Sequence, residues 1–462
     1  MTRKSPSLPR LNAHFVGIGG IGISALARWF LAQNWAVSGS DLADSQIVAD
    51  LRKAGVKVKI GQKQANLPKK GLDMVIYSSA VPYSNPELVE ARRRGVKPLS
   101  YPEVVGCLTK VYRTIAIAGS HGKSTTTALT SLVLMKAKLD PNVILGTNLK
   151  EFGNSNFRKG RSKWLVLEAD EWSASFLNYY PEITVVTNID KEHLDFYKNL
   201  ANVKKIFLKF LGNTKVGGYL VLNRDDKALF SLKSPILKLA VKNKLEVYWY
   251  SLNDRGSRIE DRGLRKVLKI PGEHNVSNAM AALSVARILK IKLSVALRAL
   301  GSYTGAWRRF EYKGRFQVSG VRCQVFDDYA HHPTEIKATL QAFREKFPKS
   351  KLVCVYQPHQ AKRLRALFKE FVGAFELADI LILLPVYEVA GRDKTSSGFT
   401  SQKLVDVIKK KYPKKEVYYL PSPKRIRNML HDTCEKFHYD HCVVVMMGAG
   451  DIVNYTPLLL HK

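Results

Sequence analysis

The chain has 462 residues, of which 45% are hydrophobic and 24% charged, a balance that is ordinary for a globular protein and excludes a disordered one. This length predicts about three domains, and no apolar run approaches the roughly 20 residues that a membrane span needs. The net charge of +35, from 74 Lys and Arg against 39 Asp and Glu, is spread over the whole chain and lacks the interleaved aromatic residues of RNA-binding motifs. We therefore predict a solvated basic surface, with neither a nucleic acid nor a membrane as partner.

The compartment follows from the first residues and from the cysteines. Residues 1–14 are basic but contain no apolar stretch of the kind that a signal peptide needs. Five cysteines, an odd number, do not suggest a disulfide framework. We expect a cytoplasmic protein, and the sequence leaves its oligomeric state open.

The first segment alternates strands and helices. Strands are predicted at Ala13–Val16, Trp35–Asp41, Val56–Ile60 and Met74–Tyr77, and helices at Ile23–Gln33 and Pro86–Arg94. This βαβ rhythm predicts a parallel sheet.

A glycine motif lies between the first strand and the first helix. It consists of Gly17, Gly19 and Gly22 in the spacing GxGxxG, with Gly20 inside it. In this context glycines let the backbone approach a pyrophosphate at a helix N-terminus. Asp41 stands where such motifs place a ribose-binding acid. Taken alone, this pattern would indicate a nicotinamide-dependent dehydrogenase.

Two further segments continue the α/β pattern. Predicted strands lie at Thr114–Ala118, Trp164–Glu168, Ile183–Asn188, Gly218–Asn223, Cys323–Tyr329, Leu352–Tyr356, Ile380–Pro385 and Val443–Met447, and predicted helices at Ala128–Ala137 and Val276–Leu289. The polar stretch Ser251–Arg265 is predicted to be a loop or hairpin. The fold class is therefore α/β with three domains, which we place at 1–107, 108–311 and 312–462.

The second segment contains another phosphate-binding loop directly after its first strand. It comprises Gly119, Ser120, His121, Gly122, Lys123, Ser124 and Thr125, a shortened relative of the P-loop. In such a loop backbone N–H groups surround phosphate, the lysine neutralises the β/γ charge, and the hydroxyl can ligate Mg²⁺. A dehydrogenase has no use for a triphosphate site. Two such loops in consecutive domains indicate a protein that joins two ligands at the expense of ATP.

Carboxylates and histidines follow several predicted strands. Glu168–Glu171 and Thr187–Asp195 fit Mg²⁺ sites beside the second loop. Asp327–Pro333 and Gln357–His359 fit ligand contacts at strand ends. The cluster from Cys434 to Cys442 contains four soft ligands, but we interpret it as packed cysteine and surface histidine rather than zinc.

These motifs together resemble the ATP-dependent Mur ligases of peptidoglycan synthesis, in family order over nearly the whole chain. The stretches that carry the resemblance are His14–Gly22, Gly119–Thr127, Glu168–Glu171, Thr187–Tyr197, Pro271–Ala282, Gly305–Glu311, Asp327–Leu340, Gln357–His359 and Met447–Ile452. The resemblance is strongest to the members that join L-alanine to UDP-N-acetylmuramate.

The resemblance implies Rossmann-like first and third domains and a central P-loop-type ATPase domain with a parallel sheet, each with its own role. The first would hold the UDP-sugar, so its glycine loop would bind a UDP pyrophosphate and not NAD. The second would bind ATP, and the third would close over the amino acid. The reaction would begin with transfer of the γ-phosphoryl group to the substrate carboxylate, and the amine of L-alanine would then attack the acyl phosphate.

The resemblance also implies residue roles. Catalysis would involve Lys123, Glu168, His193 and His331, and Mg²⁺ would be held by Ser124, Glu168 and His193. ATP would contact Gly119–Thr125, Asn275, Asn278, Arg308, Arg309 and Asp328. The UDP-sugar would contact Gly17, Gly19, Gly20, Gly22 and Asp41. The amino acid would contact Tyr329, His359 and Arg363.

The sequence leaves alternatives open. Gln360 stands where the family commonly has an arginine, which leaves Arg363 and Arg365 to pair a carboxylate. The strictness of selection for L-alanine over glycine or L-serine is therefore not predicted. A ligase that recycles a tripeptide onto UDP-N-acetylmuramate shares many of the motifs. A dehydrogenase, or a non-catalytic anion-binding protein, would leave most of them unexplained.

Overall fold

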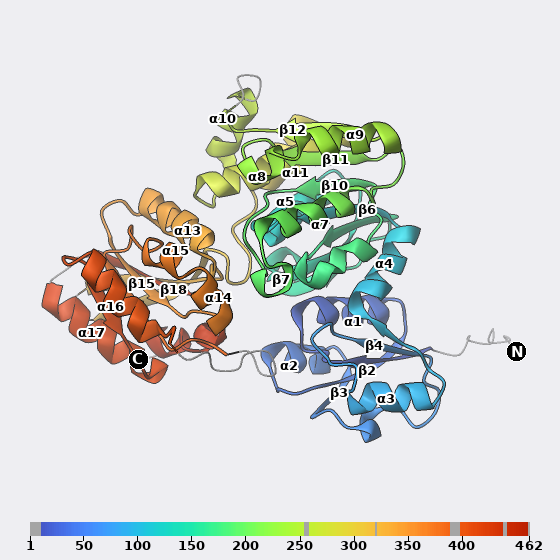
Figure 1. The fold of residues 1–462 in the computed structure, drawn as a ribbon, viewed down its shortest axis with the longest axis horizontal. Helices are drawn as coiled ribbons and strands as arrows, with labels where there is room; N and C mark the ends of the chain where they lie inside the picture. Colours follow the sequence, from blue (N-terminus) through green and yellow to red (C-terminus); the bar gives the residue numbers. More distant parts are fainter. Residues whose placement is uncertain (1–10, 254–257, 319–320, 389–397, 438–440, 461–462) are drawn as a thin grey trace, which may run out of the picture.

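Three sheets, each flanked by helices, follow one another along the chain in the computed structural model (Figure 1). The structure describes residues 11–253, 258–318, 321–388, 398–437 and 441–460. Within these residues, no helix has the length and apolar character needed to cross a bilayer. Short 3₁₀ helices connect some elements, at Gln64–Asn66, Lys150–Phe152, Trp172–Asn178, Pro423–Arg425 and Asp451–Asn454.

The first sheet is entirely parallel, in the order β3-β2-β1-β4-β5. Its strands are β1 (Asn12–Val16), β2 (Ala36–Asp41), β3 (Lys57–Ile60), β4 (Met74–Tyr77) and β5 (Pro98–Ser100). The helices are α1 (Ile21–Ala32), α2 (Gln46–Lys53), α3 (Pro86–Arg93) and α4 (Tyr101–Val111). The order reverses between β1 and β4, so the glycine loop after β1 lies at the switch point where such sheets bind ligands.

The middle sheet has the order β12-β11-β10-β6-β9-β7-β8, and only the β7–β8 pair is antiparallel. Its strands are β6 (Arg113–Ala118), β7 (Asn142–Leu149), β8 (Ser155–Arg158), β9 (Trp164–Glu168), β10 (Ile183–Val186), β11 (Tyr219–Asn223) and β12 (Glu246–Tyr250). The helices are α5 (Lys123–Lys136), α6 (Leu194–Tyr197), α7 (Leu200–Leu211), α8 (Lys227–Phe230), α9 (Lys233–Asn243), α10 (Arg258–Val267), α11 (Glu273–Ile288) and α12 (Leu293–Leu300). Because β6, β9 and β10 are parallel neighbours, the segments that follow them meet at one edge of the sheet.

The third sheet has the order β13-β14-β18-β15-β16-β17, with only the edge strand β13 antiparallel. Its strands are β13 (Glu311–Val318), β14 (Val321–Asp328), β15 (Lys351–Tyr356), β16 (Ile380–Leu383), β17 (Glu416–Tyr419) and β18 (His441–Met447). The helices are α13 (Pro333–Lys346), α14 (Ala361–Ala366), α15 (Phe368–Val372), α16 (Ser401–Lys411), α17 (Ile426–Phe437) and α18 (Pro457–Leu460).

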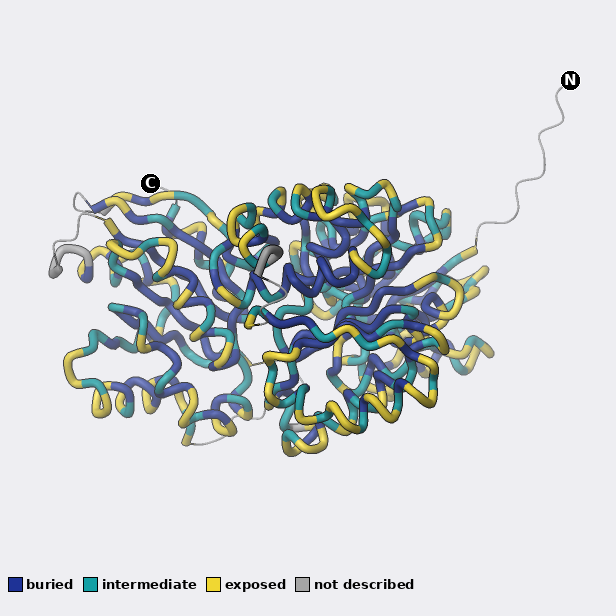
Figure 2. The backbone as a smooth tube through the Cα atoms, turned by 90° about the horizontal axis from the view of Figure 1, so that it is seen from above, coloured by how far each residue is buried: buried dark blue, intermediate teal, exposed yellow. Residues whose placement is uncertain are grey.

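Buried residues lie on both faces of the middle and third sheets. Figure 2 marks the buried parts of the backbone in dark blue. One core is continuous from Phe15 in the first sheet, through Val105 of α4, to Phe176 and Phe207 beside the middle sheet. This shared apolar core attaches the first domain to the second, because separating them would expose it to water.

The predicted α/β class and three-sheet architecture are confirmed, with two corrections to individual elements. The stretch Ser251–Arg265 is not simply a loop or hairpin, because α10 begins at Arg258. The helix predicted from Ala128 begins at Lys123, directly after the phosphate-binding loop. The domain limits predicted at 107/108 and 311/312 fall within α4 and at the start of β13.

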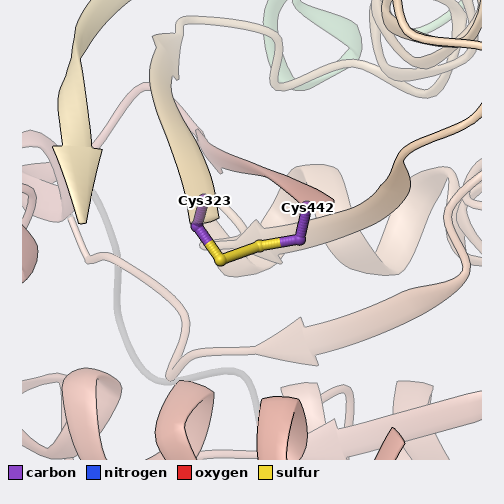
Figure 3. Close-up of a disulfide and its surroundings, with 2 residues drawn as sticks. All are labelled: Cys323 and Cys442. Carbon is purple, nitrogen blue, oxygen red and sulfur yellow. A yellow bond between two sulfur atoms is a disulfide. The ribbon is translucent and has the colours of Figure 1, made fainter. Parts of the chain in front are cut away.

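A disulfide joins Cys323 of β14 to Cys442 of β18 (Figure 3). The two cysteines are 119 residues apart in sequence but are register partners on adjacent parallel strands, and both are buried. The number of cysteines gave no indication of this pair. The two residues are brought together by the order of the strands in the sheet, which the sequence did not predict. Cys442 is therefore packed as predicted but also bonded, whereas His438 lies outside the described residues.

Candidate active site

The first glycine loop is shaped by contacts that exclude side chains. A Cβ atom at Gly19 would lie 2.9 Å from the Oδ2 atom of Asp41, which accepts a 2.8 Å hydrogen bond from the Gly19 N–H group. Gly17 has φ = +76°, a conformation that glycine adopts without strain. Asp41 thus holds the backbone of the loop itself, and Gly20 and Gly22 face the cleft described below.

The second loop also requires glycines, because the segment after β10 and helix α11 approach it closely. A Cβ atom would lie 2.0 Å from Thr187 Oγ1 at Gly119 and 2.4 Å from Asn278 Oδ1 at Gly122. Both glycines have positive φ angles, of 137° and 82°. The Thr187 hydroxyl donates to the His121 carbonyl at 2.6 Å, so the segment after β10 fixes the loop.

Lys123, the first residue of α5, is buried in an ion pair. Its Nζ atom lies 2.8 Å from Glu171 Oε2 and donates to the Gly119 carbonyl at 2.8 Å. Burial acts to lower the pKa of Lys123, but the carboxylates of Glu171 and Asp170 raise it above its ordinary value. The lysine therefore keeps its positive charge at the mouth of the loop.

Carboxylates beside Lys123 have the donor chemistry of a Mg²⁺ site. Glu168 accepts hydrogen bonds from Ser124 Oγ at 3.1 Å and from the Gly146 N–H group at 2.8 Å. Ligand atoms of Asp170, Glu171 and His193 lie within 4.8 Å of one another. Among the described residues, the buried Oε1 atom of Glu171 has no hydrogen-bond partner, and it lies 3.7 Å from His193 Nε2. Carboxylate and hydroxyl oxygens are the ligands that Mg²⁺ prefers, so this cluster fits that ion.

A cavity of about 630 Å³ lies between the middle and third domains. Its walls contain seven of the residues predicted to bind ATP: His121, Gly122, Thr125, Asn275, Asn278, Arg309 and Asp328. The Asp328 carboxylate accepts hydrogen bonds from the Phe310 and Ala330 N–H groups, both at 2.9 Å. Asp328 therefore shapes the turn after β14 as well as lining the cavity.

A second cavity, of about 570 Å³, is lined by all three domains. Its walls contain the predicted residues Gly20, Gly22, Ser120, Gly122, Lys123, Ser124, Glu168, His193, Arg308, Arg309, Tyr329, His331, His359 and Arg363. Gly122, Arg309 and Glu335 line both cavities, so the two share a wall. Strand order has assembled at one place residues from the whole length of the chain.

The third domain contributes a buried cation and two neutral imidazoles to this second cavity. Arg363 Nη2 donates to Glu192 Oε2 at 3.0 Å. Burial acts to raise the pKa of Glu192, but Arg363 holds it well below its usual range. Burial lowers the pKa of His331 to about 4 and that of His359 to about 3. At neutral pH both imidazoles are uncharged.

His121 connects the second glycine loop to α13 of the third domain. Its Nε2 atom lies 3.0 Å from Asp190 Oδ2, and its Nδ1 atom lies 3.3 Å from Glu335 Oε1. Asp190 also accepts a 2.7 Å hydrogen bond from the Thr334 hydroxyl. Burial would lower the pKa of His121, but its hydrogen bond with Asp190 and its ion pair with Glu335 raise it to about 10. An imidazolium ion between two carboxylates thus joins the two domains.

Some placements differ from the sequence-based roles. Arg308, predicted on the ATP phosphates, lines the second cavity, and its guanidinium donates to the carbonyls of Gly448 and Gly450. Sequence reasoning also missed Glu192 and Glu335 as site residues. Glu192 lies in the acidic stretch singled out above, but its partner is 171 residues away. Glu335 is the third residue of α13, a position where a carboxylate is expected to cap the helix. The sequence therefore gave no sign of its second role, the ion pair with His121.

Three family models match successive parts of the chain. They are described as the Mur ligase family catalytic domain at residues 12–113, the Mur ligase middle domain at 117–286, and the Mur ligase glutamate ligase domain at 309–450. Together they cover most of the three sheets.

Individual proteins are similar over nearly their full lengths. UDP-N-acetylmuramate–L-alanine ligase from Clostridium novyi is 39% identical over 459 residues, covering 97% of this chain and 96% of the relative. The ligase of the same name from a Sulfurihydrogenibium species is 36% identical over 454 residues, covering 96% of each. The crystal structure of UDP-N-acetylmuramate-alanine ligase from Thermotoga maritima has a TM-score of 0.77 at 27% identity, over 98% of each chain.

Proposed function

This chain belongs to the Mur ligase family, and from that premise we propose that it is the ATP-dependent ligase that joins L-alanine to the carboxylate of UDP-N-acetylmuramate in peptidoglycan synthesis. The named activity of relatives that match the chain end to end supports the choice of substrates. The observation that carries the proposal is the 570 Å³ cavity, where the first glycine loop, Lys123 and Arg363 meet from three domains.

ATP would occupy the 630 Å³ cavity, with its γ-phosphate at the wall formed by Gly122, Arg309 and Glu335. A carboxylate oxygen of the sugar nucleotide then attacks the γ-phosphorus, the bond from phosphorus to the bridging oxygen breaks, and ADP leaves. Lys123 and Arg309 balance the negative charge that gathers in this step.

The residues beside the loop would hold Mg²⁺ through Ser124, Glu168 and His193, with Glu171 next to them. Bound there, the ion neutralises phosphate charge.

The second step forms the amide. The amine of L-alanine attacks the acyl carbon, the bond from that carbon to the phosphate oxygen breaks, and inorganic phosphate leaves. Arg363 pairs with the alanine carboxylate, while the neutral His331 and His359 can accept a proton near the attacking amine. Tyr329 lines the same cavity.

The first domain would bind the UDP part, with Gly20 and Gly22 next to the pyrophosphate and with Asp41 holding the loop in shape. We place the reaction in the cytoplasm, where ATP and nucleotide sugars are available. No nucleic acid or membrane partner enters the scheme.

The test is phosphate release from ATP in the presence of UDP-N-acetylmuramate and one amino acid at a time. L-alanine should support turnover, and glycine and L-serine report how strict the selection is. Release that depends on a tripeptide and not on L-alanine would assign the chain to the recycling ligases instead. Release that depends on no amine acceptor would exclude both.

A further inference from the structure

The ion pair between Glu192 and Arg363 lies inside the cavity that three domains line. The two side chains are 4% and 10% exposed, and their closest charged atoms are 3.0 Å apart. Glu192 follows β10 in the middle domain, whereas Arg363 is on α14 of the third domain. The pair therefore closes one side of the substrate cavity across a domain boundary.

Each member of the pair retains unused hydrogen-bonding capacity. The Glu192 bonds to Arg363 and to the His193 N–H group both use Oε2. Among the residues that the structure describes, Oε1 of Glu192 accepts no hydrogen bond. Arg363 uses Nη2 for Glu192, and its Nη1 atom is 3.5 Å from His359 Nδ1, a weak contact. Each ion can thus bind a ligand group while part of the contact between them remains.

The surrounding groups leave these two as the natural charge partners for a small ligand. His331 and His359 line the same cavity, and burial keeps both neutral at pH 7. Of the other cations that line this cavity, Lys123 is already bonded to Glu171, and Arg308 donates to the carbonyls of Gly448 and Gly450. Arg309 is the cation that the proposed function places beside the γ-phosphate. A free α-amino acid carries one ammonium and one carboxylate on the same carbon, so it matches adjacent opposite charges.

We propose that Glu192 binds the ammonium group of the incoming amino acid while Arg363 binds its carboxylate, so that this pair is a zwitterion-binding site spanning two domains. The inference rests on the proposed function and adds a residue to it. Without the amino acid the two side chains neutralise each other, which removes the cost of a buried unpaired charge. Binding of the amino acid replaces part of this contact and still links α14 to the middle domain.

The test compares L-alanine with L-lactate, which keeps the carboxylate and the methyl group but has a hydroxyl in place of the ammonium. Wild-type phosphate release with L-alanine is measured first, because its absence would defeat the proposed function and not this inference. Affinity for each ligand is then measured by calorimetry with a non-hydrolysable ATP analogue and UDP-N-acetylmuramate present, a readout that needs no turnover. The variants are Glu192→Gln, Glu192→Asp and Arg363→Lys.

Glu192→Gln should weaken the binding of L-alanine by about tenfold or more, because the ammonium group loses its carboxylate partner. The affinity for L-lactate should stay the same or rise, because lactate has no ammonium group and Glu192 no longer competes with it for Arg363. Glu192→Asp should restore part of the L-alanine affinity. Arg363→Lys should weaken both ligands, because it removes the bidentate carboxylate partner. ATP affinity should stay near the wild-type value in all three. Equal losses for L-alanine and L-lactate in Glu192→Gln, or no loss for either, would overturn the proposal and leave a merely structural ion pair.

Discussion

Two carboxylates lie beside the ammonium group of Lys123: Glu171 is 2.8 Å and Asp170 is 3.9 Å from its Nζ atom. These carboxylates hold the lysine charged and in position. In the proposed function, phosphate oxygens would take over this contact, and the lysine would need little reorganisation.

Replacing Lys123 with alanine should abolish measurable phosphate release, because it removes the ammonium group that the proposed function places on the β- and γ-phosphates. Binding of UDP-N-acetylmuramate to the first domain should remain, as measured by calorimetry. Lys136→Ala, at the exposed end of the same helix, is the matched control and should behave as wild type. Near-normal release from Lys123→Ala would remove the loop from the ATP site.

Gly19 tests the first loop in the same way. A valine there would place its Cβ atom 2.9 Å from Asp41 Oδ2 and 3.1 Å from Val48 Cγ2, so the loop must shift. We predict that Gly19→Val weakens UDP-sugar binding by about tenfold or more while ATP binding holds. Equal loss of both, measured in parallel titrations, would mean that the change acts on the fold and not on the loop.

His121 predicts a pH effect. Its pKa of about 10 in the folded protein exceeds the ordinary value of 6.5. A raised pKa contributes stability that is fully present below about pH 6.5 and lost as the pH rises through about 10. Thermal unfolding should therefore show a fall in stability towards pH 10 that is smaller in His121→Gln. Parallel pH profiles for the two proteins would contradict the ion pairs of His121 with Asp190 and Glu335.

At the scale of elements, apolar runs in the sequence predicted buried strands but not polar helices. Met74–Tyr77 and Trp164–Glu168 are strands with the predicted bounds, because a buried parallel strand is a nearly continuous apolar run. The polar stretch containing α10 gave no such pattern. That helix is stabilised by tertiary contacts, namely the burial of Leu264 and the pairing of Arg265 with Glu273 of α11, and by an i,i+4 pair between Asp261 and Arg265 within the helix.

In the candidate site too, local features could be predicted from the sequence and contacts between domains could not. The two glycine loops are local in sequence, so their position between strand and helix could be predicted. The pairing of Glu192 with Arg363, and of His121 with Glu335, depends on how two domains meet, which no spacing in the sequence encodes. Residue types were predictable there, and partners were not.

The disulfide between β14 and β18 gives a prediction at this scale. Cys323 and Cys442 lie near the starts of their strands, about 15 Å from the carboxyl ends where the site lies. The double variant Cys323→Ala/Cys442→Ala should keep its phosphate-release rate but lose about 2–4 kcal/mol of unfolding free energy. Reduced wild type should match it. A large loss of turnover would show that the bond positions the site.

At the scale of the whole molecule, the residues that line the 570 Å³ cavity come from three domains. In the proposed function, catalysis therefore requires the three domains to be in contact. We predict that small-angle scattering shows a smaller radius of gyration when an ATP analogue and UDP-N-acetylmuramate are both present. Glu335→Gln, which weakens the contact between α13 and the nucleotide loop, should reduce that compaction. An unchanged radius on adding both ligands would mean that the domains are already closed in solution.

The wall shared by the two cavities has a consequence for inhibitor design. Gly122, Arg309 and Glu335 line both cavities, whose volumes are about 630 Å³ and about 570 Å³. A compound that places an anionic linker across this wall, beside Arg309, could fill part of each space with one molecule. Resistance to it would then be difficult to acquire, because Gly122 has no room for a side chain, and substitution of Arg309 or Glu335 would alter both spaces at once.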